Sequence, residues 1–161
     1  MRGSGRQAFP APPRASAPGV ELIRILFAGR AKAAFLAEGL TQFLPRLRRY
    51  RVELVENPRP GTAREEEAFF LRHLQPGRTA LALEPGGRVL DSPGFAAALD
   101  AARNPDLLIG GADGLPAAVL QRCADRLSLS AMTFSHELAL LVLLEQIYRA
   151  DTLATGHPYH R

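Results

Sequence analysis

Asp106-Leu-Leu-Ile-Gly-Gly-Ala-Asp-Gly114 is the stretch that decides the fold class, because it joins a short apolar run to a glycine-rich turn. The apolar run has the length and composition of a buried strand. The turn is followed by Pro116, which suits the first position of a helix predicted to run to about Asp125. A buried strand that leads through a tight turn into a helix is typical of α/β proteins.

The rest of the chain also alternates predicted strands and helices. Runs of branched or alternating apolar residues predict strands over 20–27, 52–56, 78–83 and 127–130. The strand over 78–83 is expected to end at Pro85-Gly-Gly87. Helical spacing or capping residues predict helices over 31–47, 62–74, 92–102 and 137–150. Thr62 and Glu65 form a predicted capping box, and Ser92 a predicted cap. This order predicts an α/β fold with a largely parallel sheet that helices cover on both faces.

Length and composition predict one domain over residues 20–161, preceded by a disordered extension over 1–19. The extension has four prolines and few large apolar side chains. The longest apolar run, Leu138–Leu144, has seven residues, far fewer than the ~20 that a membrane helix needs. The single cysteine, Cys123, excludes an internal disulfide and a thiolate metal site. We therefore expect a cytoplasmic protein with no membrane span and no metal.

The net charge of +4 does not by itself indicate a nucleic-acid partner. Three of the four excess positive charges lie in residues 1–20, and nearly all the basic residues are arginines, which is typical of a genome-wide composition bias. The densest basic cluster in the predicted domain comprises Arg46, Arg48, Arg49 and Arg51. Such a cluster is either a solvated helix end or a group of contacts to RNA phosphates.

Three predicted strand ends are candidates for a ligand site, since ligands of open α/β sheets bind beyond the carboxyl ends of the strands. They are Leu83-Glu84, the turn at Gly110-Gly111, and Ser130-Ala-Met-Thr-Phe134. Glycines in the turn let a ligand approach the backbone closely. The chain contains neither G-x-G-x-x-G nor the P-loop pattern. A tight turn without any ligand is the alternative.

The C-terminal region concentrates groups that transfer protons, stack on bases or bind phosphate. His136, His157 and His160 lie there beside Tyr159 and Arg161. Two tail histidines are too few for a structural zinc site, and no G-x-S-x-G turn indicates a nucleophile. A solvated tail without a role is the alternative. The last helix, apolar on every side, predicts either a homodimer interface or a well-covered core helix.

Four blocks of sequence resemble one known family, and together they extend over residues 21–161. The blocks are Leu107–Gly114, Leu127–His136, Leu144–Ala150 and His157–Arg161. They resemble the RlmH family, SPOUT-class methyltransferases that use S-adenosylmethionine to methylate N3 of a pseudouridine in large-subunit (23S) ribosomal RNA. The resemblance implies a C-terminal trefoil knot, a homodimer and the assembled ribosome as substrate. Periodicity alone predicts no knot.

The resemblance also assigns roles to residues. It implies that the cofactor is bound by the following strand ends and loop: Leu83, Gly110, Gly111, Leu129, Ser130, Ala131, Met132, Thr133 and Phe134. It places Tyr159, His160 and Arg161 of the tail, with His136, in a catalytic site composed from both subunits. His136 or His160 is the expected proton acceptor.

Departures from the family pattern leave two alternatives open. Ser135 stands where the family often has proline, Glu84 where it often has aspartate, and Arg30 and Lys32 are the nearest remnants of its early loop lysines. The chain is therefore expected to be the methyltransferase, with an inactive cofactor-binding protein of the ribosome, or an enzyme for another RNA, as the alternatives.

Overall fold

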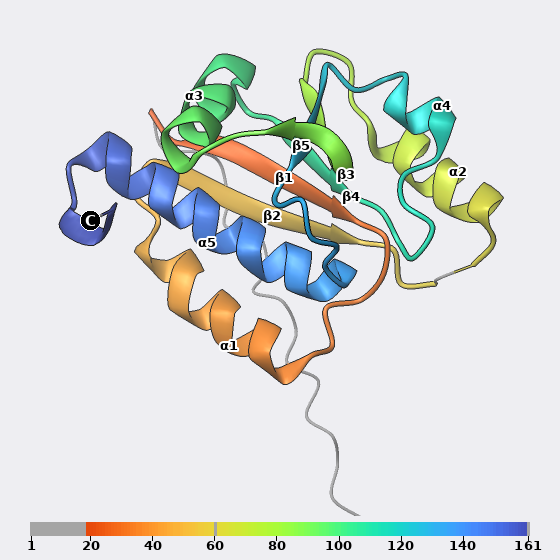
Figure 1. Ribbon diagram of the computed structural model, residues 1–161, viewed down its shortest axis with the longest axis horizontal. Helices are drawn as coiled ribbons and strands as arrows, with labels where there is room; N and C mark the ends of the chain where they lie inside the picture. The colour runs from red at the N-terminus through yellow and green to blue at the C-terminus, as the bar shows by residue number, and fades with distance from the viewer. Residues whose placement is uncertain (1–18, 60, 161) are drawn as a thin grey trace, which may run out of the picture.

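The computed structural model describes residues 19–59 and 61–160, and the predicted extension over 1–19 lies almost wholly outside them. One parallel sheet has the strand order β2-β1-β4-β3-β5 (Figure 1). Its strands are β1 Glu21–Phe27, β2 Tyr50–Glu56, β3 Ala80–Val89, β4 Asp106–Ile109 and β5 Asp125–Ser128. The predicted α/β class with a parallel sheet is confirmed, and the trefoil knot stays a prediction.

Helices cover both faces of this sheet, as the sequence predicts. The helices are α1 Ala34–Phe43, α2 Ala63–His73, α3 Ser92–Ala102, α4 Ala117–Leu120 and α5 His136–Thr155, with the 3₁₀ turns η1 Leu44–Arg46 and η2 Pro158–His160. In Figure 1, α5 lies between α1 and α3 on one face, and α2 and α4 lie together on the other.

Alternation along the strands builds the two halves of the core, because successive side chains point to opposite faces. Ile23, Ile25 and Phe27 of β1 pack under α1, α3 and α5. Leu26 points to the other face, where it meets Phe70 of α2. Each face of the sheet is therefore buried, which accounts for the nearly continuous apolar character of the strands.

The prediction that the third strand ends at Pro85-Gly-Gly87 is wrong. β3 pairs with β5 up to Leu83, bulges, and pairs again from Arg88 to Val89. Gly87 makes the return possible, since a Cβ there would lie 2.6 Å from the backbone carbonyl carbon of Leu127. The bulge places Glu84 beside the carboxyl ends of the strands rather than within the ladder.

Several element ends also differ from the predictions. The capping box of Thr62 and Glu65 is confirmed. The cap of α3 is Asp91, which accepts from the Gly94 amide, whereas Ser92 donates to Gln146 of α5. α4 is a single turn rather than a helix to Asp125, because the Ala124 amide already donates to the Ala80 carbonyl and begins the pairing of β5.

α5 is longer than predicted and lies in the core along most of its length. Leu140, Leu143 and Ile147 are fully buried against the sheet, as the core-helix alternative expects. The helix ends at Gly156, whose φ of 70° is the left-handed conformation that favours glycine. Within the described residues, no helix is long and apolar enough to cross a membrane.

Candidate functional site

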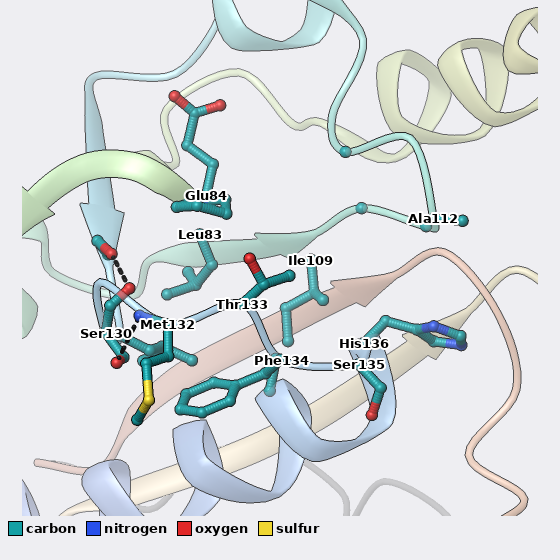
Figure 2. Close-up of a pocket in the computed structure, with 17 residues that line it drawn as sticks. Leu83, Glu84, Ile109, Ala112, Ser130, Met132, Thr133, Phe134, Ser135 and His136 are labelled. Carbon is teal, nitrogen blue, oxygen red and sulfur yellow. Dashed lines mark hydrogen bonds between the residues drawn. The ribbon is translucent and has the colours of Figure 1, made fainter.

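A cavity of about 370 Å³ lies at the carboxyl ends of β3, β4 and β5, next to the first turn of α5 (Figure 2). This is the edge of the sheet where the three predicted strand ends meet. Its lining comprises Leu83, Glu84, Pro85, Ile109, Gly110, Gly111, Ala112, Gly114, Ser128, Leu129, Ser130, Met132, Thr133, Phe134, Ser135, His136 and Ala139. We call it the strand-end cavity.

The glycine turn after β4 forms one wall and has no room for a side chain at its first position. A Cβ on Gly110 would lie 2.5 Å from the carbonyl carbon of Gly114 and 2.7 Å from the amide nitrogen of Leu115. Gly114 has a φ of 76°, and its amide donates to the Gly111 carbonyl at 3.1 Å. The turn therefore closes tightly on itself and presents backbone to the cavity.

Glu66 of α2 stabilises this turn through a hydrogen bond to its backbone. Its Oε1 accepts from the Gly111 amide at 3.0 Å. Nothing in the sequence pointed to Glu66, since the contact joins residues 45 positions apart on different elements. The capped first turn of α2 carries the carboxylate to this place.

The loop between β5 and α5 forms the opposite wall and is held by its own serines. Ser128 donates from Oγ to the Ser130 carbonyl at 2.8 Å, and the Met132 amide donates to the Ser130 Oγ at 3.0 Å (Figure 2). Ser135 caps α5 by accepting from the Leu138 amide. A serine at this position therefore contributes to the start of the helix, where capping is worth about 1 kcal/mol.

His136 is the first residue of α5 and lines the cavity. Its ring packs against Phe27, with 5.3 Å between centroids, and lies close to Gly29. Figure 2 shows Glu84 at the top of the labelled group and His136 at its right. The residue is partly buried, and its Nε2 lies toward Gly29.

The loop that follows β1 lies beside His136 and is held by carboxylates. The amides of Lys32 and Ala33 donate to Oε1 of Glu137, at 2.6 and 2.9 Å. The Ala31 amide donates to Oε1 of Glu56 at 2.6 Å. α1 begins at Ala34 rather than at the predicted residue 31, because the backbone of Ala33 is extended, with φ −64° and ψ 136°.

The lining of the strand-end cavity has an electrostatic character that restricts its ligand. It contains one carboxylate, Glu84, and neither lysine nor arginine. Arg126 lies 3.6 Å from Glu84 Oε1 but outside the lining. Apolar walls with a single carboxylate suit a ligand that combines an aromatic ring with positive charge.

The structure brings eight of the nine residues predicted to bind the cofactor into this one cavity. The ninth, Ala131, is exposed and does not line it. Among the described residues, no group of three or more metal-ligating side chains occurs.

The tail lies elsewhere within the protomer. Tyr159 packs edge-to-face on Tyr148, with 4.7 Å between ring centroids, and its hydroxyl donates to Glu145 Oε1 at 3.2 Å. Arg149 lies over its ring at 5.0 Å. Partial burial and the carboxylate of Glu145 raise the pKa of the Tyr159 phenol, which remains a hydrogen-bond donor at neutral pH. The side chain of His160 and the whole of Arg161 lie outside the described residues.

Tyr159 and His136 are therefore not brought together within one protomer. The residues that Tyr159 contacts lie nine to thirteen positions after His136 on α5. At a rise of 1.5 Å per residue they are roughly 14–20 Å away along the helix axis.

Comparisons with known proteins identify the family of the chain. The family model described as "Predicted SPOUT methyltransferase" matches residues 22–160. Proteins named "Ribosomal RNA large subunit methyltransferase H" are similar over 86% of this chain: one from Anaeromyxobacter dehalogenans (strain 2CP-C) is 40% identical with 99% of its length covered, and one from Synechococcus sp. (strain RCC307) is 43% identical with 94% covered.

A solved structure supports the fold alone. It was described under the heading "Structural insights into the 2-OH methylation of C/U34 on tRNA" and is 18% identical, with a TM-score of 0.50. The similarity covers 83% of this chain and 93% of that one. With the family model matching nearly all of the described residues, the chain belongs to the SPOUT methyltransferase family, whose methyl donor is S-adenosylmethionine.

Proposed function

We propose that this methyltransferase methylates N3 of a pseudouridine in large-subunit ribosomal RNA on the assembled ribosome, in the cytoplasm. The relatives at about 40% identity, which it matches over nearly their whole length, carry the name of a large-subunit ribosomal RNA methyltransferase. The observation that carries the proposal is the strand-end cavity, because it combines a pocket suited to a methyl donor with a histidine in its lining.

The residues of the cavity fit S-adenosylmethionine. This cofactor has an adenine ring and carries positive charge on its sulfonium and ammonium groups. The apolar side chains of Leu83, Ile109 and Leu129 suit the ring, and the Glu84 carboxylate suits the positive charge, with no lysine or arginine in the lining to oppose it. The backbone of the glycine turn, free of side chains, lets the ligand approach closely.

The reaction needs the methyl donor and the target base to be positioned, and it needs one proton to be removed from the target nitrogen. S-adenosylmethionine supplies an electrophilic methyl group when bound. The target nitrogen carries a weakly acidic proton, which it must lose as the bond from nitrogen to the methyl carbon forms. His136 is the proposed acceptor, since it lines the cavity and a neutral imidazole has a ring nitrogen that can accept a proton. The sulfur–methyl bond would break as the nitrogen–methyl bond forms, with its electron pair left on the sulfur, and the glycine turn and the loop after β5 would position the cofactor for that transfer.

We also propose that a homodimer completes the site, with the tail of one subunit at the strand-end cavity of its partner. Tyr159 contacts the C-terminal half of α5 in its own subunit, whereas the strand-end cavity lies at the N-terminal end of that helix. Tyr159 therefore does not reach the cavity of its own subunit. Apolar side chains on α1 and α5 support a subunit interface: Phe35 is 47% exposed and Leu138 is 38% exposed. A twofold dimer would bury such a patch against itself.

Methyl transfer to defined RNA substrates tests the proposal. The protein is incubated with labelled S-adenosylmethionine and ribosomes that lack the modification, with free 23S RNA and tRNA in parallel. Label on a large-subunit pseudouridine, from ribosomes only, is the expected result. Label on tRNA would assign another RNA, and cofactor binding without label on any substrate would support an inactive binder.

Replacement of Glu66 by alanine is expected to weaken cofactor binding by about fivefold. The substitution leaves the Gly111 amide without its acceptor, and the loss of such a bond costs about 1 kcal/mol. Calorimetry with S-adenosylmethionine measures the effect, and KM for the cofactor should rise while kcat at saturation changes little. Glu67→Ala, one residue along α2, is the matched control. Equal dissociation constants for the two variants would contradict a positioning role.

A further inference from the structure

A second cavity lies at the other end of α5, at least about 13 Å along the helix from the strand-end cavity. It has a volume of about 430 Å³ and lies between η1, the turn before β2 and the last turns of α5. The residues that line it are Pro45, Arg46, Arg48, Tyr148, Asp151, Thr152, Thr155 and His157. We call it the Arg46–Arg48 pocket.

Asp151 lines this pocket, and three backbone amides bind one oxygen of its carboxylate. The residue is only 1% exposed, and its Oδ2 accepts from the amides of Arg48, Arg49 and Tyr50 at 3.0, 2.7 and 3.1 Å. Three amide donors satisfy one carboxylate oxygen and fix the turn that carries Arg48. The turn is therefore held in place before any ligand binds.

The four arginines of the basic cluster have different surroundings. Arg49 is engaged with Asp100 at 2.7 Å, with Glu21 at 3.2 Å and with the ring of Tyr50. Arg51 does not line the pocket. Arg46 and Arg48 line it, are exposed, and have no ion-pair partner among the residues that the structure describes.

The remaining polar groups of the pocket are mostly paired already. The hydroxyls of Thr152 and Thr155 donate to helix carbonyls, at 2.8 and 2.9 Å. The Thr152 carbonyl accepts from the amides of Gly156 and His157, so the end of α5 is capped. The donors left for a ligand include two guanidinium groups and the imidazole of His157. This donor set recognises an anion with several oxygens, and a guanidinium matches phosphate in a two-bond geometry.

We propose that the Arg46–Arg48 pocket binds a backbone phosphate of the substrate RNA. This inference rests on the proposed function, which supplies an RNA of high phosphate density. Tyr148 lines the pocket, and Tyr159 of the tail packs against its ring. A phosphate bound in the pocket would therefore fix the RNA next to the tail. Phosphate contacts of this kind set the register of the nucleic acid and carry no base specificity.

The test compares two double variants that remove the same charge from different places. Arg46→Gln with Arg48→Gln removes the pocket cations, and Arg64→Gln with Arg72→Gln removes two exposed arginines of α2, on the opposite face of the sheet. Affinity for ribosomes is measured by cosedimentation at several salt concentrations, together with KM for ribosomes and affinity for S-adenosylmethionine. Unchanged cofactor affinity shows that each variant is folded.

The pocket variant is expected to raise KM for ribosomes about tenfold and to reduce the salt dependence of binding by about two counterions. The α2 variant should keep the affinity and salt slope of the unmodified protein. Identical behaviour of the two variants would overturn the inference. So would binding of inorganic phosphate that only the pocket variant loses, with ribosome affinity unchanged, because the pocket would then take a free anion. Absence of methylation by the unmodified protein would count against the proposed function instead, since cosedimentation does not depend on turnover.

Discussion

Removal of Tyr159, His160 and Arg161 is expected to lower methylation of ribosomes by more than about 100-fold, the loss typical of a missing positioning or proton-transfer group. Affinity for S-adenosylmethionine should stay within about threefold, since the lining of the strand-end cavity includes no residue of the tail. Within a protomer the tail lies far along α5 from the strand-end cavity, so its removal leaves the cofactor walls intact. Single-turnover methylation and calorimetry measure the two quantities.

Tyr159→Phe is the control for this deletion, because it keeps the ring that packs on Tyr148 and removes only the hydroxyl. If the melting temperature of the deletion variant is close to that of the unmodified protein, its loss of activity is not a loss of fold. A large fall in cofactor affinity after the deletion would mean that the tail binds the cofactor, and the proposed role in RNA recognition would be wrong.

The sheet and the position of the cavity were predictable from sequence because both follow from local patterns. Each strand carries its own apolar run, and in a parallel sheet the carboxyl ends of the strands meet at one edge. Three unusual strand ends, at Leu83, Gly110 and Ser130, therefore had to approach one another once the strands were parallel. The family resemblance added the identity of the ligand, which no spacing of residues contains.

Other features depend on contacts between distant residues and could not be predicted. β3 resumes pairing after its bulge only because Gly87 fits against the backbone of Leu127. Glu66 reaches Gly111 only because α2 packs on that face of the sheet. The roles of the arginines in the basic cluster could not be predicted either, since nothing in the sequence distinguishes them. Only the fold shows that Arg49 forms an ion pair with Asp100, whereas Arg46 and Arg48 line the pocket.

Gly110→Ala is expected to weaken cofactor binding by about 5- to 150-fold, which corresponds to the roughly 1–3 kcal/mol that overpacking costs. The new methyl group would lie 2.5–2.7 Å from backbone atoms of Gly114 and Leu115, which cannot rotate away as a side chain would. The turn must open, and it forms a wall of the strand-end cavity. Gly86→Ala is the matched control, because nothing lies within 4 Å of a Cβ there. Equal affinities for the two variants, with unchanged melting temperatures, would contradict the role assigned to the turn.

Mixing the Gly110→Ala protein with the tail-deleted protein extends this prediction to the dimer, when the cofactor concentration is too low to fill the Gly110→Ala cavity. A Gly110→Ala subunit retains its tail, and a subunit that lacks residues 159–161 retains its cavity. If each site combines the cavity of one subunit with the tail of the other, a heterodimer has one site with both defects and one site with neither. Random exchange of subunits should then restore about a quarter of the activity, because half the dimers are mixed and half their sites are intact. If each tail instead served the cavity of its own subunit, every site would keep one defect, and mixing would restore nothing.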